Sequence, residues 1–160
     1  MMFKQRTHST RHGGFSLIEL MITLTIVGIL VGMAYASYSN SVRKSRRTEA
    51  RAAVLDAAGR EERLYSTLNA YSNSPIQLGY STTAGSFGGG LSVGSGYYLL
   101  TVTNVAAAAA GTPATYTVTV TATGTQTSDS ACASFSVDQQ GNQTATNSGG
   151  GDNSTVCWTK

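Results

Sequence analysis

The chain has 160 residues, of which 12% are charged and 41% are hydrophobic, and it contains 18 glycines. This charged fraction is about half that of ordinary globular proteins, which argues against a cytosolic enzyme and favours an exported protein. The formal net charge is +3, but Lys4, Arg6 and Arg11 alone supply three positive charges near the N-terminus. The rest of the chain is therefore close to neutral, and the net charge is no argument for nucleic-acid binding.

A basic segment, residues 1–14, precedes an apolar run over residues 15–38. As a helix the apolar run would be about 36 Å long, enough to cross a hydrocarbon core of about 30 Å. A secretory signal carries its cleavage site after the apolar region. Here the candidate site, Gly13 and Gly14, stands before it. Cleavage at this site would leave the apolar helix on the mature chain.

Glu19 is the one charged residue within the apolar run. A carboxylate in the apolar part of a bilayer costs about 2.5–3.5 kcal/mol on insertion scales. Cleavage before Phe15 would create an amine one helical turn away, which could compensate this charge on the same chain or on a neighbouring one. The alternative is a carboxylate that reaches the headgroups near the start of the helix.

With Gly14, Phe15 and Glu19 in these positions, the segment resembles the processing and assembly motif of type IV pilins. The resemblance implies that a prepilin peptidase cleaves between Gly14 and Phe15 and N-methylates Phe15, and that Glu19 sets assembly and register among other pilin subunits. It also implies a single-pass protein of the inner membrane with a periplasmic head, which the pilus assembly machinery moves into a surface pilus. Family filaments often unwind this helix between a Gly and a downstream Pro. Gly28 and Gly32 are present but the Pro position is Ala36, so melting there stays open.

Residues 39–71 are predicted to continue the helix in amphipathic form. Apolar residues recur there at spacings of three and four: Ala50, Ala53, Val54, Ala57, Leu64, Tyr65 and Leu68. This face is expected to pack on the head. Residues 41–66 resemble the corresponding helix of minor pilins of the PilE kind.

The same helix carries a candidate interaction stripe of five cations: Arg43, Lys44, Arg46, Arg47 and Arg51. One interpretation is a solvated helix face with local partners such as Glu49. The others are contacts with anionic lipid headgroups, with acidic residues of a neighbouring subunit, or with DNA phosphates. DNA is the least favoured partner, because no aromatic residues interleave with these charges to stack on bases.

The C-terminal part is expected to form an antiparallel head. Residues 72–96 are predicted to be a Gly/Ser-rich connecting loop, and residues 97–160 a β-sheet. Alternating patterns predict strands around residues 97–103, 116–122 and 131–137, with a turn at residues 140–142 and a short fourth strand over residues 143–146. The fold class is therefore α+β, the type IV pilin fold that the resemblance implies.

Two cysteines, Cys132 and Cys157, lie in the C-terminal quarter of the chain. An even number of cysteines in an exported chain predicts one disulfide. Residues 132–157 would then resemble the disulfide-bounded loop of the pilins, which is the usual contact surface of that family.

We predict no enzyme activity for this chain. Both histidines, His8 and His12, belong to the expected leader, which removes histidine-based catalysis from the mature chain. We also predict no catalytic residues, metal site, cofactor or small-molecule substrate.

The function expected from these features is that of a structural, minor subunit of a type IV pilus. Its roles would be pilus assembly or initiation, and pilus-dependent motility, adhesion or DNA uptake. Two alternatives stay open: a pseudopilin of a type II secretion system, and a DNA-binding minor pilin for natural transformation.

Overall fold

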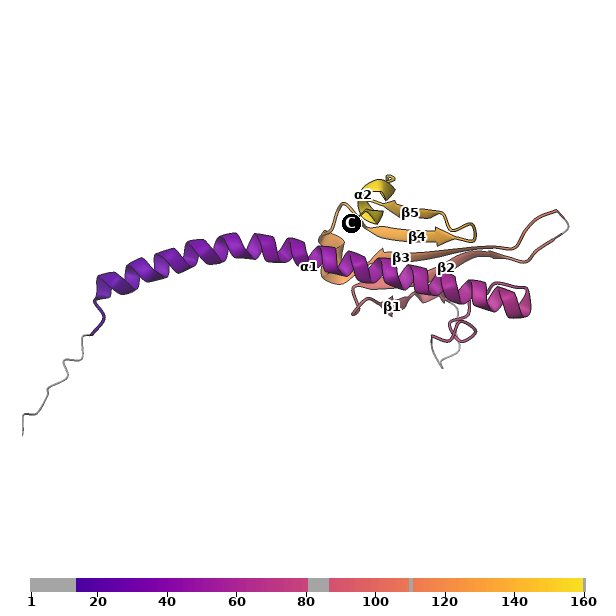
Figure 1. Ribbon diagram of the computed structural model, residues 1–160, viewed down its shortest axis with the longest axis horizontal. Helices are drawn as coiled ribbons and strands as arrows, with labels where there is room; N and C mark the ends of the chain where they lie inside the picture. The colour runs from indigo at the N-terminus through magenta and orange to yellow at the C-terminus, as the bar shows by residue number, and fades with distance from the viewer. Residues whose placement is uncertain (1–13, 81–86, 110, 160) are drawn as a thin grey trace, which may run out of the picture. The chain divides into compact units, whose positions relative to one another are not determined.

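The computed structural model describes residues 14–80, 87–109 and 111–159 (Figure 1). The chain divides into two compact units, Met1–Asn40 and Ser41–Lys160. The expected leader, residues 1–14, falls outside the described residues except for Gly14.

Helix α1 (Leu17–Leu68) begins in the first unit and continues into the second. Its large apolar side chains up to Tyr38 are exposed by 53–76%. Within the described residues, α1 is the helix that is long and apolar enough to cross a membrane. Helix α1 runs through Gly28, Gly32 and Ala36 without interruption.

In the second unit, one face of α1 packs on a sheet. Ala50, Val54 and Ala57 are fully buried in one cluster with residues of the strands, and Ala58 is nearly so. The predicted face is confirmed at these three fully buried positions. It is wrong at Leu68, which is 62% exposed, because α1 ends there and Asn69 turns the chain with a left-handed backbone (φ 53°).

The sheet is an antiparallel meander of five strands in the order β1-β2-β3-β4-β5 (Figure 1). The strands are β1 (Leu91–Val93), β2 (Tyr98–Ala106), β3 (Thr115–Ala122), β4 (Ser134–Asp138) and β5 (Gln143–Thr146). Buried and half-exposed residues alternate along β2, β3 and β4. The buried set forms the core with α1, while threonines and serines occupy the other face. The α+β fold class and the strand over residues 143–146 are confirmed.

Three parts of the head differ from the expectation. The segment 72–96 contains a short 3-10 helix η1 (Phe87–Gly89) and strand β1, which is too short for alternation to be visible. Strand β4 begins at Ser134 rather than near residue 131, and a 3-10 helix η2 (Gly124–Ser128) precedes it. The C-terminal tail forms a one-turn helix α2 (Ser154–Trp158). Gly94, Ser95 and Gly96 all adopt positive φ in the turn that joins β1 to β2.

Candidate functional site

The N-terminal part of α1 carries Glu19 in its first turn. The carbonyl of Ser16, just before α1, accepts the backbone N–H groups of Glu19 at 3.1 Å and of Leu20 at 3.2 Å, which starts the helical hydrogen bonding. A negative charge in the first turn is favoured by the helix dipole. Phe15 precedes the helix and is 77% exposed. Both residues are therefore accessible on an isolated subunit.

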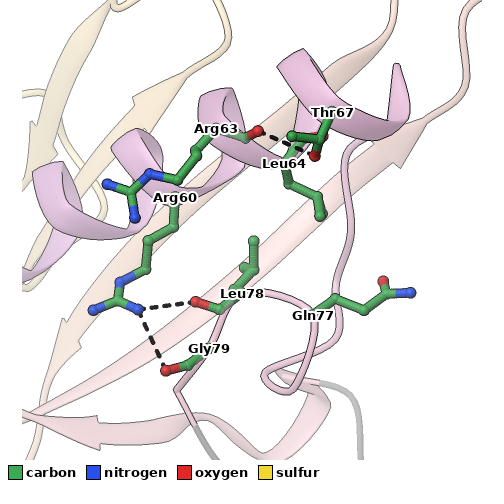
Figure 2. A pocket seen from close by; sticks show the side chains of 7 residues that line it. All are labelled: Arg60, Arg63, Leu64, Thr67, Gln77, Leu78 and Gly79. Atoms are coloured by element: carbon green, nitrogen blue, oxygen red, sulfur yellow. Dashed lines mark hydrogen bonds between the residues drawn. The ribbon is translucent and has the colours of Figure 1, made fainter.

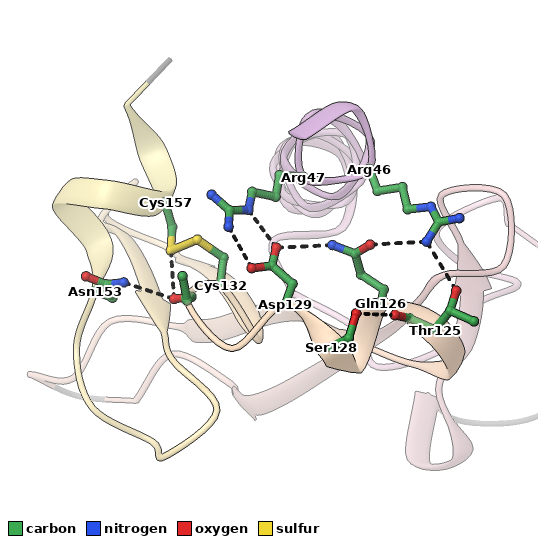
Figure 3. Close-up of polar contacts among 10 residues, drawn as sticks. Arg46, Arg47, Thr125, Gln126, Ser128, Asp129, Cys132, Asn153 and Cys157 are labelled. Atoms are coloured by element: carbon green, nitrogen blue, oxygen red, sulfur yellow. Dashed lines mark hydrogen bonds and ion pairs between the residues drawn. A yellow bond between two sulfur atoms is a disulfide. The ribbon is translucent and has the colours of Figure 1, made fainter. Parts of the chain in front are cut away.

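Arg47 of α1 is paired with a buried acid of the head (Figure 3). Its Nε and one terminal nitrogen each donate to a carboxylate oxygen of Asp129 at 2.6 Å. Asp129 is 3% exposed and also accepts a hydrogen bond from Gln126 Nε2 at 3.2 Å. Such a bidentate, charge-assisted pair is among the stronger polar contacts in proteins. It joins α1 to the segment between η2 and β4.

Arg46 points to the other side of α1 and also contacts the head (Figure 3). Its guanidinium donates to Thr125 Oγ1 at 3.2 Å and, more weakly, to Gln126 Oε1 at 3.5 Å. The same guanidinium lies 3.5 Å from the centre of the Tyr97 ring, a cation–π contact. Arg46 and Arg47 therefore hold one segment of the head from two sides of the helix.

Arg51 secures the C-terminal end of α2. One of its terminal nitrogens donates to the backbone carbonyls of Trp158 and Thr159 at 3.2 and 3.1 Å. These carbonyls are at the end of α2, where helical carbonyls lack partners within the helix. A cation at the C-terminal end of a helix is stabilising.

The predicted disulfide between Cys132 and Cys157 is present, with Cα atoms 5.7 Å apart (Figure 3). Both cysteines are buried in the core cluster. Asn153 Nδ2 donates to the carbonyl of Ala131 at 3.0 Å beside the bridge. The disulfide and this hydrogen bond fasten α2 to the segment that precedes β4.

The five cations of the candidate stripe therefore differ in their roles. Arg46, Arg47 and Arg51 contact the head, whereas the side chains of Arg43 and Lys44 make no hydrogen bond or salt bridge within the described residues. Among the described residues, the expected local partner Glu49 forms no salt bridge with the stripe, and one of its carboxylate oxygens is buried without a hydrogen bond. The acid that pairs with the stripe there is Asp129.

Two cavities lie along α1 in the second unit. The smaller one, of about 340 Å³, is crossed by Arg60, which donates to the carbonyls of Leu78 and Gly79 (Figure 2). The larger one, of about 670 Å³, lies between α1 and α2 and is lined by Lys44, Arg47, Thr48, Arg51, Val156, Cys157 and Thr159. Within the described residues, no group of three or more His, Cys, Asp or Glu side chains is placed to hold a metal ion.

Glu61 is a buried acid that the sequence analysis did not single out. Its side chain is fully buried; one carboxylate oxygen accepts the N–H of Ser72 at 3.0 Å and the other has no hydrogen bond. Burial raises the pKa of Glu61 to about 7. The neighbouring carboxylate of Glu62 acts in the same direction. Glu61 is therefore a site at which the stability of the head responds to pH.

The chain matches two family models and two named pilus proteins. The family described as type IV minor pilin ComP, DNA uptake sequence receptor, matches residues 36–136. The prokaryotic N-terminal methylation motif matches residues 9–35. Fimbrial protein Q of Moraxella bovis is 31% identical over 110 residues, which cover 58% of this chain and 70% of that protein. The type IV major pilin protein PilA of Myxococcus xanthus (strain DK1622) is 29% identical over 75 residues, 47% of this chain but only 34% of PilA.

An apolar N-terminal helix that continues into a disulfide-closed antiparallel head defines a class of filament subunits, the type IV pilins. Because the ComP match covers more than half of the residues, the chain belongs to this family of type IV pilins. The proteins that it matches are structural pilins and not enzymes.

The sequence analysis missed Asp129 and Gln126, whose side chains accept hydrogen bonds from arginines of α1. Asp129 lies in a polar stretch, residues 123–130, where neither strand nor helix periodicity marks a position as buried. One signal in the sequence could have found Asp129. It is the only charged residue of this stretch, and the chain has few acids to pair with the many arginines of the helix.

Proposed function

We propose that this chain is a minor subunit of a type IV pilus that is cleaved between Gly14 and Phe15, N-methylated on Phe15, and packed into the filament through α1. The match to the methylation motif covers these residues and Glu19 and supports the proposal. The observation that carries it is an apolar helix segment whose large side chains are exposed in the single subunit. Such a surface needs lipid or other helices around it.

Glu19 is the proposed register residue. A carboxylate surrounded by packed helices loses its water, and an unpaired charge in such a place is expensive. The amine of Phe15 on a neighbouring subunit would compensate it. Since this pairing is possible at one axial offset between subunits, it would also set their register.

The test replaces Glu19 by Leu and measures incorporation into sheared pili. Membrane insertion and leader cleavage should be unchanged, because the helix only becomes more apolar, whereas incorporation should fall at least severalfold. A matched control is Thr23→Leu, one turn further along an exposed part of α1, which also introduces a leucine but keeps the charge of Glu19. Normal incorporation of the Glu19→Leu chain would contradict the proposed role.

The proposed location before assembly is the inner membrane, crossed once, with the head in the periplasm. The proposed partners are the prepilin peptidase, the assembly machinery of the inner membrane, and other pilin subunits. The ComP match favours a pilus over a type II secretion pseudopilus. Deletion of the gene should therefore impair pilus functions such as twitching and leave secretion intact; the reverse result would indicate a pseudopilin.

A second proposed role is DNA binding by the head, which the ComP match favours. The cations available for it are those whose side chains make no hydrogen bond or salt bridge in the described residues, namely Arg43, Lys44 and the exposed Arg63. Binding through phosphates should weaken steeply with salt. Removal of a cation that contacts phosphate should reduce the salt slope by about one.

The test uses the full chain in detergent micelles with labelled duplex DNA at several salt concentrations. Arg43→Gln, Lys44→Gln and Arg63→Gln are compared one at a time. Glu62→Gln serves as a variant that removes a negative charge and leaves every cation in place. Salt-insensitive binding, or binding that none of the three cation variants changes, would exclude this role while leaving the pilus-subunit role untouched.

A further inference from the structure

The larger cavity is a cleft between two helices of the head. One wall consists of Lys44, Arg47, Thr48 and Arg51, which lie on one face of α1 at spacings of three and four residues. The other wall consists of Val156, Cys157 and Thr159, at and just after the end of α2. The volume of about 670 Å³ is in the range of small-molecule sites.

The charges on the α1 wall are only partly compensated. The charge of Arg47 is neutralised by the two 2.6 Å hydrogen bonds to Asp129. Arg51 donates to two backbone carbonyls and to the Thr48 hydroxyl, all of which are neutral groups. The exposed side chain of Lys44 makes no hydrogen bond or salt bridge in the described part of the chain. Two positive charges are therefore left facing the cleft.

The covalent chain keeps this cleft close to the membrane surface. Lys44 follows Tyr38, the last residue of the apolar run, by six positions. Even a fully extended chain would separate these two residues by at most about 22 Å. The headgroup layer is itself roughly 5–7 Å deep on each side of the hydrocarbon, and the Lys44 side chain extends further from the backbone.

We propose that the cleft between α1 and α2 binds the phosphate of an anionic phospholipid while the subunit is in the membrane. Lys44 supplies a mobile point charge, and Arg51 supplies the N–H groups of its guanidinium that the carbonyls do not use. Val156, which is 53% exposed, supplies an apolar contact for the glycerol part of the lipid. This role goes beyond filament packing and DNA binding, since it concerns the subunit before assembly. The lipid must leave when the subunit enters the filament.

The experiment places the full chain in nanodiscs of phosphatidylcholine with and without phosphatidylglycerol. Native mass spectrometry then identifies the lipids that stay bound when the protein is released. Phosphatidylglycerol should be enriched over phosphatidylcholine on the wild-type chain, and Lys44→Gln should reduce this enrichment about fivefold, the size expected for one lysine beside an anionic membrane surface. Arg63→Gln is the matched control: it removes the same charge from an exposed position outside the cleft and should keep the enrichment.

The proposal is overturned if phosphatidylglycerol is not enriched, or if Lys44→Gln and Arg63→Gln reduce the enrichment equally, because either result indicates nonspecific attraction. A second arm uses lipid-free micelles with inorganic phosphate and follows the fluorescence of Trp158. A phosphate response that is as strong as that of phosphatidylglycerol and depends on Lys44 would identify a general anion site instead. Reduced pilus incorporation of Lys44→Gln with unchanged lipid retention would assign the cleft to contacts between subunits and exclude the lipid role.

Discussion

Arg47 of helix α1 and Asp129 of the head form a bidentate ion pair with both hydrogen bonds at 2.6 Å. Arg47 is 21% exposed, whereas Asp129 is 3% exposed. Because Asp129 is almost without contact to water, its charge depends on the hydrogen bonds from Arg47 and Gln126. The pair therefore fastens helix α1 to the segment between η2 and β4, although its arginine belongs to a stripe that also suits an external partner.

Replacement of Arg47 by Gln should lower the free energy of unfolding of the head by about 2–4 kcal/mol, because it leaves the buried charge of Asp129 without its main partner. Denaturant unfolding of the full chain in micelles, followed by Trp158 fluorescence, measures the change. Trp158 is the single tryptophan and its ring lies 5.8 Å from that of Phe135 in the core, so it reports on the head. Arg63→Gln should stay within about 0.5 kcal/mol of wild type. Equal effects of the two variants would show that the ion pair is dispensable.

Removal of the disulfide by Cys132→Ser should lower stability by about 2–5 kcal/mol. The bridge joins residues separated by 25 positions and holds α2, on which Arg51 also depends. Cys157 should become reactive to alkylating agents without reductant, which mass spectrometry detects. The double change Cys132→Ser with Cys157→Ser should be similarly destabilised and unreactive. Alkylation of the unreduced wild-type chain would show that the bridge is absent.

Glu61 should make the head less stable at neutral than at mildly acidic pH. Burial raises its pKa from an ordinary value of 4.5 to about 7 in the folded chain. Its contribution to stability is therefore fully present below about pH 4.5 and is lost as pH rises through about 7. Glu61→Gln should remove this dependence and stabilise the head by about 1–3 kcal/mol above pH 7.

Unfolding of the wild-type and Glu61→Gln chains across this pH range provides the measurement. Glu62→Gln serves as the control: this neighbour is exposed and accepts a hydrogen bond from the Tyr71 hydroxyl at 3.2 Å. The Glu62→Gln chain should retain most of the pH dependence of the head's stability. A constant difference in stability between the wild-type and Glu61→Gln chains from acid to neutral pH would exclude Glu61 as its source.

Processing of the chain should leave Phe15 as the first residue, carrying one methyl group on its nitrogen. Intact-mass and N-terminal peptide analysis of protein from pili would show this directly. Gly14→Val should block cleavage, because it replaces the Gly that precedes the scissile bond in the processing motif that this segment resembles. A mature chain that keeps Met1, or one cleaved after the apolar run, would contradict the pilin processing scheme.

The fold could be predicted from the sequence where a pattern repeats. The apolar run, the amphipathic positions Ala50, Val54 and Ala57, and the alternation through Tyr116, Val118 and Val120 each repeat a physical period of helix or strand. The disulfide followed from the cysteine count and the export signal. Strand β1, with 3 residues, and helix α2, with 5 residues, were missed because elements this short show no repeating pattern of apolar residues.

The roles of the arginines were decided by the tertiary structure. The sequence alone determined that α1 carries a basic stripe after its apolar run, and that Glu19 stands alone within that run. It could not separate Arg47, paired with Asp129 across 82 positions, from Lys44, which faces the cleft. The physical reason is that an arginine's partner depends on which distant acid the sheet brings to the helix, and this acid lies in a stretch without periodicity. Burial makes this pairing necessary, because the charge of Asp129 is shielded from water and is costly unless a side chain beside it compensates it.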